Sequence, residues 1–136
     1  RLVSDNALPE TAEVLSIGID PAVYQTHGVS LSTSGYRFLY AGRITPDKGV
    51  HTILDAIGYL RKVNINPKLT IIGNGYDEYI PLLTALAKKR GISDLVEFHD
   101  PVKRDEMPGI YNLNDVLIAP SIEFDTMTTC SHICIN

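Results

Sequence analysis

The chain has 136 residues, 44% of them hydrophobic, so it is long enough for one compact domain with its own core and too short for two. Its 12 Lys and Arg against 16 Asp and Glu give a formal net charge of -4, which argues against a general nucleic-acid-binding protein, because such proteins need clustered cations. No apolar run approaches the roughly 18 residues of a membrane span, so we expect a cytoplasmic protein, with peripheral contact to a membrane left open for the full-length protein. The absence of an initial Met suggests that the chain starts inside a longer polypeptide.

Residues 1–35 are predicted to form an interdomain segment. VLSIGID, over residues 14–20, is a candidate strand that ends in a turn, and residues 25–35 are rich in Ser, Thr and Gly. His27 in this stretch has no evident partner in the sequence, nor has His51 further on. We therefore expect both to be solvated.

Residues 36–136 are predicted to form the folded domain, in which four near-continuously apolar runs alternate with helix-period segments. The runs are RFLYA (37–41), KLTIIG (68–73), LVEFH (95–99) and DVLIAP (115–120). Such runs are typical of strands buried on both faces of a parallel sheet. Because the order is β-α-β-α-β-α-β, right-handed crossovers predict an α/β fold, an open Rossmann-like parallel sheet with helices on both faces.

Three helices are predicted between these strands. The first has apolar residues at spacings of three and four over residues 50–60. The second, over 80–87, continues through three basic residues to a stop at Gly91, where cations complement the helix dipole. The third, over 105–112, requires Pro108 to lie in its first turn.

Glycines and polar residues follow the carboxyl ends of the predicted strands, where ligands bind in open α/β sheets. GRITPDKG (42–49) follows the first strand and GNG (73–75) follows the second. Arg43 offers a fork of donors to phosphate oxygens and Lys48 a mobile charge, so the pair suits a diphosphate. The alternative is a solvated turn in which both cations pair with Asp47 and other carboxylates. These residues alone favour neither the diphosphate site nor the solvated turn.

Taken in order, four segments resemble the retaining group 1 glycosyltransferases, family 4-like enzymes with the two-domain GT-B fold. The segments are SIGIDPAVY, LYAGRITPDKGVHTILDAI, LTIIGNGYDEY and VEFHDPVKRDEMPGIYNLNDVLIAPS. They correspond to the N-G-V-D turn that leads into the nucleotide-sugar-binding domain, the G-R-l-x-x-x-K-G strand and helix, the G-x-G strand end, and the pattern that closes on D-v-x-v-x-P-S. The resemblance covers residues from about 16 to 121 in the right order and spacing.

This resemblance implies that the chain is the donor-binding part of an enzyme that transfers a sugar from a nucleoside diphosphate to an acceptor. In the family the arginine and the lysine, here Arg43 and Lys48, bind the diphosphate and stabilise the charge on the leaving nucleotide, so no metal is usually needed. Gly42, Gly73 and Gly75 are expected to give the diphosphate room.

The nucleotide base is expected to bind at the turn after the third strand, residues 99–102. In the family this turn contacts the base, often through backbone groups, and we expect Val102 to take part. The chain has Asp100 where the family has glycine, which leaves the choice of base open. His99 is predicted to be a solvent-facing turn residue, with a place in the pocket as the alternative.

The donor sugar is expected to contact Glu123, with Asp125 as a further candidate. Glu123 falls one position earlier than the first glutamate of the family, and Ser131 stands where the family has its second glutamate. The family's glutamate motif is therefore absent or broken in this chain.

Two parts of such an enzyme are missing from this sequence. The amino-terminal domain, which binds the acceptor, whether a sugar, a lipid or a protein, is not present, so the isolated chain is predicted to be inactive. The remaining strand and helices of this domain are expected to be missing too, which predicts an open sheet edge. At the end of the chain, Cys130, His132 and Cys134 make an incomplete metal site, and we expect free thiols rather than zinc.

Two other functions stay open. One is a stand-alone nucleotide- or phosphate-binding module that never performs transfer and whose binding does not depend on the sugar. The other is a receiver-like or scaffold domain that binds no nucleotide. A receiver-like domain would need an acidic cluster at the strand ends, where this sequence has Arg43 and Lys48 instead.

Overall fold

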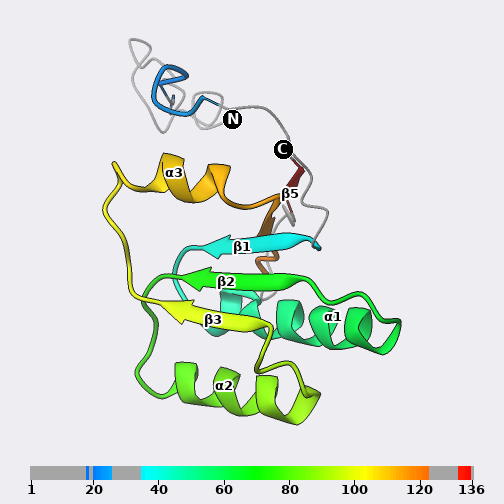
Figure 1. Ribbon diagram of the computed structural model, residues 1–136. Helices are drawn as coiled ribbons and strands as arrows, with labels where there is room; N and C mark the ends of the chain where they lie inside the picture. Colours follow the sequence, from blue (N-terminus) through cyan, green and yellow to red (C-terminus); the bar gives the residue numbers. More distant parts are fainter. Residues whose placement is uncertain (1–17, 19, 26–34, 123–131, 136) are drawn as a thin grey trace, which may run out of the picture.

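The computed structural model describes residues 18, 20–25, 35–122 and 132–135. Residues 35–122 and 132–135 form one layered α/β unit around a single sheet (Figure 1). Four strands are parallel: β1 (Arg37–Ala41), β2 (Lys68–Ile72), β3 (Val96–His99) and β4 (Val116–Ala119). A fifth strand, β5 (His132–Ile135), pairs antiparallel with β4, and the strand order is β3-β2-β1-β4-β5. The predicted α/β fold class, with its parallel sheet, is confirmed.

The helices lie on both sides of the sheet. They are α1 (Val50–Lys62), α2 (Tyr79–Arg90) and α3 (Met107–Asn112), and a short 3₁₀ helix, η1 (Pro46–Lys48), precedes α1. From β1 to β3 the chain steps outward along the sheet, and it then returns past β1 to β4. Right-handed crossovers therefore place α1 and α2 on one side and α3 on the other, as Figure 1 shows.

The core lies between the sheet and the pair α1 and α2. Side chains alternate along β2, so Leu69 and Ile71 are buried with apolar residues of α1, while Thr70 and Ile72 face the side of α3. The predicted helical face of α1 supplies Val50, Ile53, Leu54 and Ile57, all at most 3% exposed. Burying each such side chain contributes roughly 1.5–3 kcal/mol.

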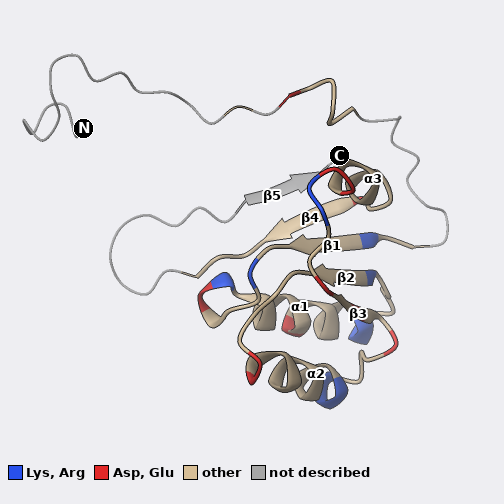
Figure 2. Ribbon diagram, turned by 90° about the vertical axis from the view of Figure 1, so that its left-hand side faces the viewer, with Lys and Arg blue, Asp and Glu red and all other residues tan. Residues whose placement is uncertain are grey.

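The predicted stop of the second helix and the predicted place of Pro108 are confirmed, whereas the third helix begins two residues later than predicted. Helix α2 ends at Gly91, whose φ of 69° is left-handed, and its last turn carries Lys88, Lys89 and Arg90, blue at the end of α2 in Figure 2. In α3, Pro108 lies in the first turn, where its missing N–H costs nothing. Among the described helices, none is long and apolar enough to cross a membrane.

Two features differ from the sequence-based expectations. The prediction that His51 is solvated is wrong, because its Nδ1 lies 2.9 Å from the Tyr79 hydroxyl of α2 and the contact is partly buried. The prediction of an open sheet edge is wrong beside β4, because β5 pairs with β4 there. The candidate strand over residues 14–20 and the loop with His27 fall largely outside the described residues, which include only Gly18 and Asp20 of that strand.

An ion pair joins the starts of β1 and β4. The Asp115 carboxylate accepts two hydrogen bonds from Arg37, one from the backbone N–H at 2.7 Å and one from the guanidinium Nη2 at 2.9 Å. In return, the Asp115 backbone N–H donates to the Arg37 carbonyl at 2.8 Å. The Asp115 side chain is only 4% exposed. The hydrogen bond from Arg37 holds the pKa of Asp115 below its usual value of 3.8.

Replacing Asp115 by alanine is expected to lower the free energy of unfolding at pH 7 by about 2–3 kcal/mol, because a charged hydrogen-bond acceptor is lost inside the structure. A depressed carboxylate pKa stabilises the fold above the unfolded-state pKa, and this stabilisation is lost as the pH falls through the folded-state pKa. Urea denaturation should therefore show a smaller difference in the free energy of unfolding between wild type and Asp115→Ala at pH 3 than at pH 7. Asp94→Ala, which breaks the exposed pair with Arg61, is the control and should change little at either pH. An equal difference for Asp115→Ala at both pH values would contradict this account.

Candidate functional site

The loop after β1 leads directly into the N-terminus of α1. Lys48 ends η1, and Gly49, with a left-handed φ of 67°, is the N-cap of α1. An ideal Cβ on Gly49 would lie 2.1 Å from the Pro120 carbonyl oxygen, and the Ile122 N–H donates to the Asp47 carbonyl at 2.8 Å. The loop is thus tied to the end of β4, and Lys48 is held beside a helix N-terminus, where anions are favoured.

The same loop packs tightly on the loop after β2. Ile44 and Gly75 form a parallel bridge beyond the two strands, and the Ile44 N–H donates to the Asn74 carbonyl at 2.7 Å. Ideal Cβ atoms on Gly73 and Gly75 would lie 1.8 and 2.0 Å from the carbonyl oxygens of Gly42 and Ile44. The two glycines of G-x-G are therefore required by the protein's own backbone, whatever ligand binds above them.

A hollow of about 350 Å³ lies at the carboxyl ends of β1, β2 and β3. It is lined by Ala41, Gly42, Arg43, Ile72, Gly73, Asn74, Pro101, Val102 and Met107. Four predicted site residues, Gly42, Arg43, Gly73 and Val102, thus come together around it. Lys48 and Gly75 lie in the adjoining loops without lining it, and Glu123 and Asp125 lie outside the described residues.

The two cations of the site differ in their surroundings. Lys48 Nζ lies 3.4 Å from the Asp47 carboxylate, and the two side chains are 33% and 44% exposed. The Arg43 side chain is exposed, and no ion pair joins it to another of the described residues. The ion pairing expected in the solvated-turn alternative is thus present for Lys48 and absent for Arg43 among the described residues. An exposed pair such as Lys48 with Asp47 is weak enough for an anion to replace it.

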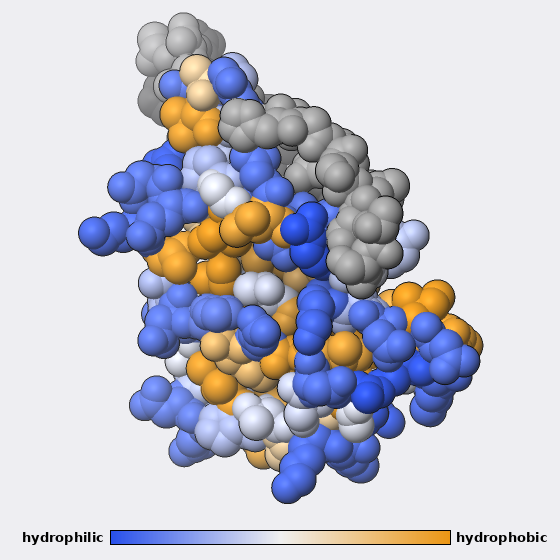
Figure 3. All heavy atoms as spheres, viewed as in Figure 1, coloured by the Kyte–Doolittle hydropathy of each residue, from blue (hydrophilic) through white to orange (hydrophobic). Residues whose placement is uncertain are grey.

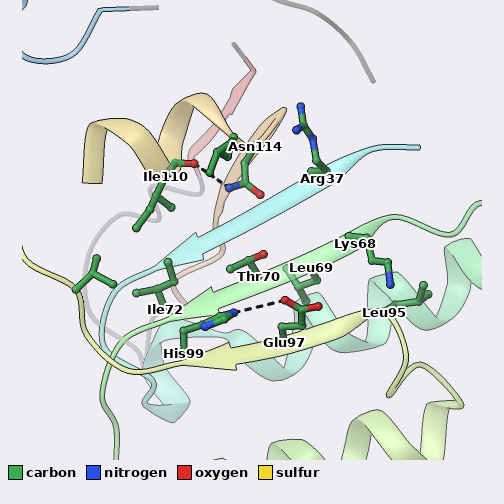
Figure 4. A pocket seen from close by; sticks show the side chains of 12 residues that line it. Arg37, Lys68, Leu69, Thr70, Ile72, Leu95, Glu97, His99, Ile110 and Asn114 are labelled. Carbon is green, nitrogen blue, oxygen red and sulfur yellow. Dashed lines mark hydrogen bonds and ion pairs between the residues drawn. The ribbon is translucent and has the colours of Figure 1, made fainter. Parts of the chain in front are cut away.

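A second hollow, of about 420 Å³, lies on the sheet face beneath α3 and shares Ile72 and Val102 with the first. In Figure 4, Thr70 and Ile72 of β2 and Ile110 and Asn114 from the α3 side border it. Apolar side chains are visible beneath α3 in the matching surface view (Figure 3).

His99 is the last residue of β3 and borders this second hollow, with its side chain half exposed. Its Nε2 lies 3.5 Å from the Glu97 carboxylate, and the two side chains point toward one another in Figure 4. The prediction that His99 is solvent-facing thus holds for its exposure, although the residue belongs to a strand and not to the turn that follows it.

Five lining residues of the first hollow were not named as site residues in advance: Ala41, Ile72, Asn74, Pro101 and Met107. Asn74 stands between the two predicted glycines, Pro101 precedes Val102, and Met107 begins α3. Their positions next to predicted residues could have identified Asn74 and Pro101, whereas Met107 reaches the hollow only because α3 folds back over the sheet. Among the described residues no group of three His, Cys, Asp or Glu side chains could hold a metal ion.

The sequence profile described as "Glycosyl transferases group 1" matches residues 28–128. The chain belongs to this family. Among its curated relatives, the lipopolysaccharide 1,2-N-acetylglucosaminetransferase of Salmonella typhimurium is 34% identical over 90 residues, which cover 61% of this chain and 23% of the relative. The D-inositol 3-phosphate glycosyltransferase of Salinispora arenicola is 26% identical over 137 residues, which cover 85% of this chain and 30% of the relative.

Solved structures of glycosyltransferases share the fold. HepE of Anabaena, solved in complex with UDP-glucose, superposes with a TM-score of 0.67 over 88% of this chain and 34% of that chain, at 19% identity. The C-terminal domain of a group 1 glycosyltransferase from Francisella tularensis superposes with a TM-score of 0.62 over 76% of this chain and 59% of that chain, also at 19% identity. At such identities the likeness shows the fold alone. The chain spans less than a third of the length of the two curated relatives named above.

Proposed function

We propose that this chain is the donor-binding part of a retaining glycosyltransferase, which takes a sugar from a nucleoside diphosphate and passes it to an acceptor bound by another domain. The observation that carries the proposal is the hollow at the carboxyl edge of the sheet. Arg43, Gly42 and Gly73 border it, and Lys48 lies beside it at the N-terminus of α1. Two cations and a helix N-terminus together match the charge of a diphosphate.

The same residues have a chemical role in the proposed transfer. As the bond between the sugar and the diphosphate breaks, negative charge grows on the departing phosphate oxygens. Arg43 and Lys48 would stabilise that charge electrostatically, which is the part that a metal ion plays in other transferases. Since the acceptor site belongs to another domain, this chain alone is proposed to bind donor without transferring sugar.

The base of the donor is left to experiment, because the relatives differ. HepE was solved with UDP-glucose, whereas a Mycobacterium tuberculosis relative, 35% identical over 78 residues, is a GDP-mannose-dependent mannosyltransferase. In this chain the turn with Pro101 and Val102 borders the hollow and is proposed to contact the base through its backbone.

Calorimetric titration of the chain with UDP, GDP and ADP tests this proposal. We expect one nucleotide to bind, the matching nucleotide sugar to bind more tightly, and EDTA to leave both affinities unchanged. A nucleotide that binds equally well with and without its sugar would favour the stand-alone phosphate-binding module. A folded chain that binds none of the three nucleotides would contradict the proposal.

A further inference from the structure

The phenol of Tyr40 lies buried beneath the loop that carries Arg43. Tyr40 is the fourth residue of β1 and is 4% exposed. Its hydroxyl donates a hydrogen bond to the main-chain carbonyl of Arg43, three residues further on. Burial, with a further contribution from the Asp47 charge, raises the pKa of Tyr40 to about 12, so the phenol keeps its proton and stays a donor at neutral pH.

Together with two backbone hydrogen bonds, this bond fixes the backbone on both sides of Arg43. Before it, the Gly42 N–H donates to the Ile72 carbonyl at 3.0 Å. After it, the Ile44 N–H donates to the Asn74 carbonyl at 2.7 Å. With its own carbonyl held inward by Tyr40, Arg43 sends its side chain outward, where it is exposed and borders the hollow.

We propose that Tyr40 is a positioning residue, which aims Arg43 at the diphosphate through its hydroxyl without touching the ligand. This inference rests on the proposed donor site. A side chain whose backbone is already fixed loses less freedom when it binds, so pre-organisation raises affinity. The ring of Tyr40 also fills the core beside Leu69 and Ile71, but phenylalanine can do that equally well. Only the hydroxyl can hold the Arg43 carbonyl.

The test compares Tyr40→Phe with Tyr79→Phe, which removes a hydroxyl from another tyrosine of the same region. The Tyr79 hydroxyl contacts His51 Nδ1 at 2.9 Å and does not hold the loop backbone. Calorimetry with the best of UDP, GDP and ADP should give a Kd about five- to tenfold higher for Tyr40→Phe than for wild type, because one hydrogen bond is lost. Tyr79→Phe should keep the wild-type Kd. Equal Kd values for Tyr40→Phe and wild type would overturn the inference.

A second measurement separates this inference from the proposed function. Amide hydrogen exchange of Ile44 in the ligand-free chain should be faster in Tyr40→Phe and unchanged in Tyr79→Phe, because only the first change frees the loop. If exchange at Ile44 is the same in all three proteins, the loop does not depend on Tyr40 and the inference is overturned. If exchange responds but the wild-type chain binds no nucleotide, it is the proposed function that fails, and the positioning role fails with it.

Discussion

Replacing Gly73 by alanine is expected to lower the free energy of unfolding by about 3 kcal/mol, because the added methyl group has no room. Its Cβ would lie 1.8 Å from the Gly42 carbonyl oxygen, and Gly73 has a φ of 151°, which side chains disfavour. The loops after β1 and β2 cannot move apart without breaking the bonds from the Gly42 N–H to the Ile72 carbonyl and from the Ile44 N–H to the Asn74 carbonyl, 3.0 and 2.7 Å long. Urea denaturation measures this loss.

Gly109→Ala is the matched control for this glycine substitution. No atom lies within 4 Å of an ideal Cβ on Gly109, which belongs to α3. Alanine favours a helix more than glycine does, so this variant should be as stable as wild type or more stable by up to about 1 kcal/mol. If Gly73→Ala unfolds at the same urea concentration as wild type, the loops after β1 and β2 do not pack as described.

The double change Arg43→Ala, Lys48→Ala is expected to weaken binding of a nucleoside diphosphate by about 100-fold or more. Each charge-assisted hydrogen bond to phosphate contributes about 1.5–3 kcal/mol, and about 1.4 kcal/mol corresponds to a factor of ten in Kd. Stability should hardly change, because Arg43 is exposed and the Lys48 pair with Asp47 lies at the surface. Calorimetry gives the affinity, and urea denaturation gives the stability.

Arg61→Ala, Lys62→Ala removes the same charge at the other end of α1 and serves as the control. Arg61 pairs with Asp94 there, remote from the hollow at the strand ends. This control variant should keep the wild-type Kd. If both double variants lose affinity equally, the nucleotide responds to the net charge of the chain, and Arg43 and Lys48 have no special role.

The place of the site could be predicted because it follows from local patterns. The apolar run of β1 and the helical spacing of α1 put Arg43 and Lys48 at a strand-to-helix junction, and both element starts match the structure. In a parallel sheet such junctions meet at one edge, so the convergence with Gly73 follows from the order of the elements.

The reason for the glycines could not be predicted, because it depends on which strands are neighbours. Gly73 needs to lack a side chain since β1 and β2 pair in a register that brings the Gly42 carbonyl against it. The sequence alone suggested room for a ligand, and that role is still a prediction. His51 was misjudged for a similar reason, because its partner Tyr79 lies 28 residues away on another helix.

Strand β5 had no counterpart in the sequence-based description for a different reason. HICI (132–135) is a short apolar run, and short runs do not distinguish a strand from other structures. Its pairing depends on the unpaired backbone groups that the edge of β4 offers. The role of Tyr40 could not be predicted either, because in the sequence it is only one more residue of an apolar run. Its hydrogen bond to the Arg43 carbonyl is seen only in the folded chain.

The most direct test of the diphosphate site is to map nucleotide binding by two-dimensional NMR on the labelled chain, with UDP, GDP and ADP added in turn. The account predicts that one nucleotide shifts the amide resonances of Gly42, Arg43, Gly49, Gly73 and Val102, while those at the C-terminal ends of α1 and α2 stay in place. Shifts confined to other regions, or a folded chain with no shifts at millimolar nucleotide, would contradict it.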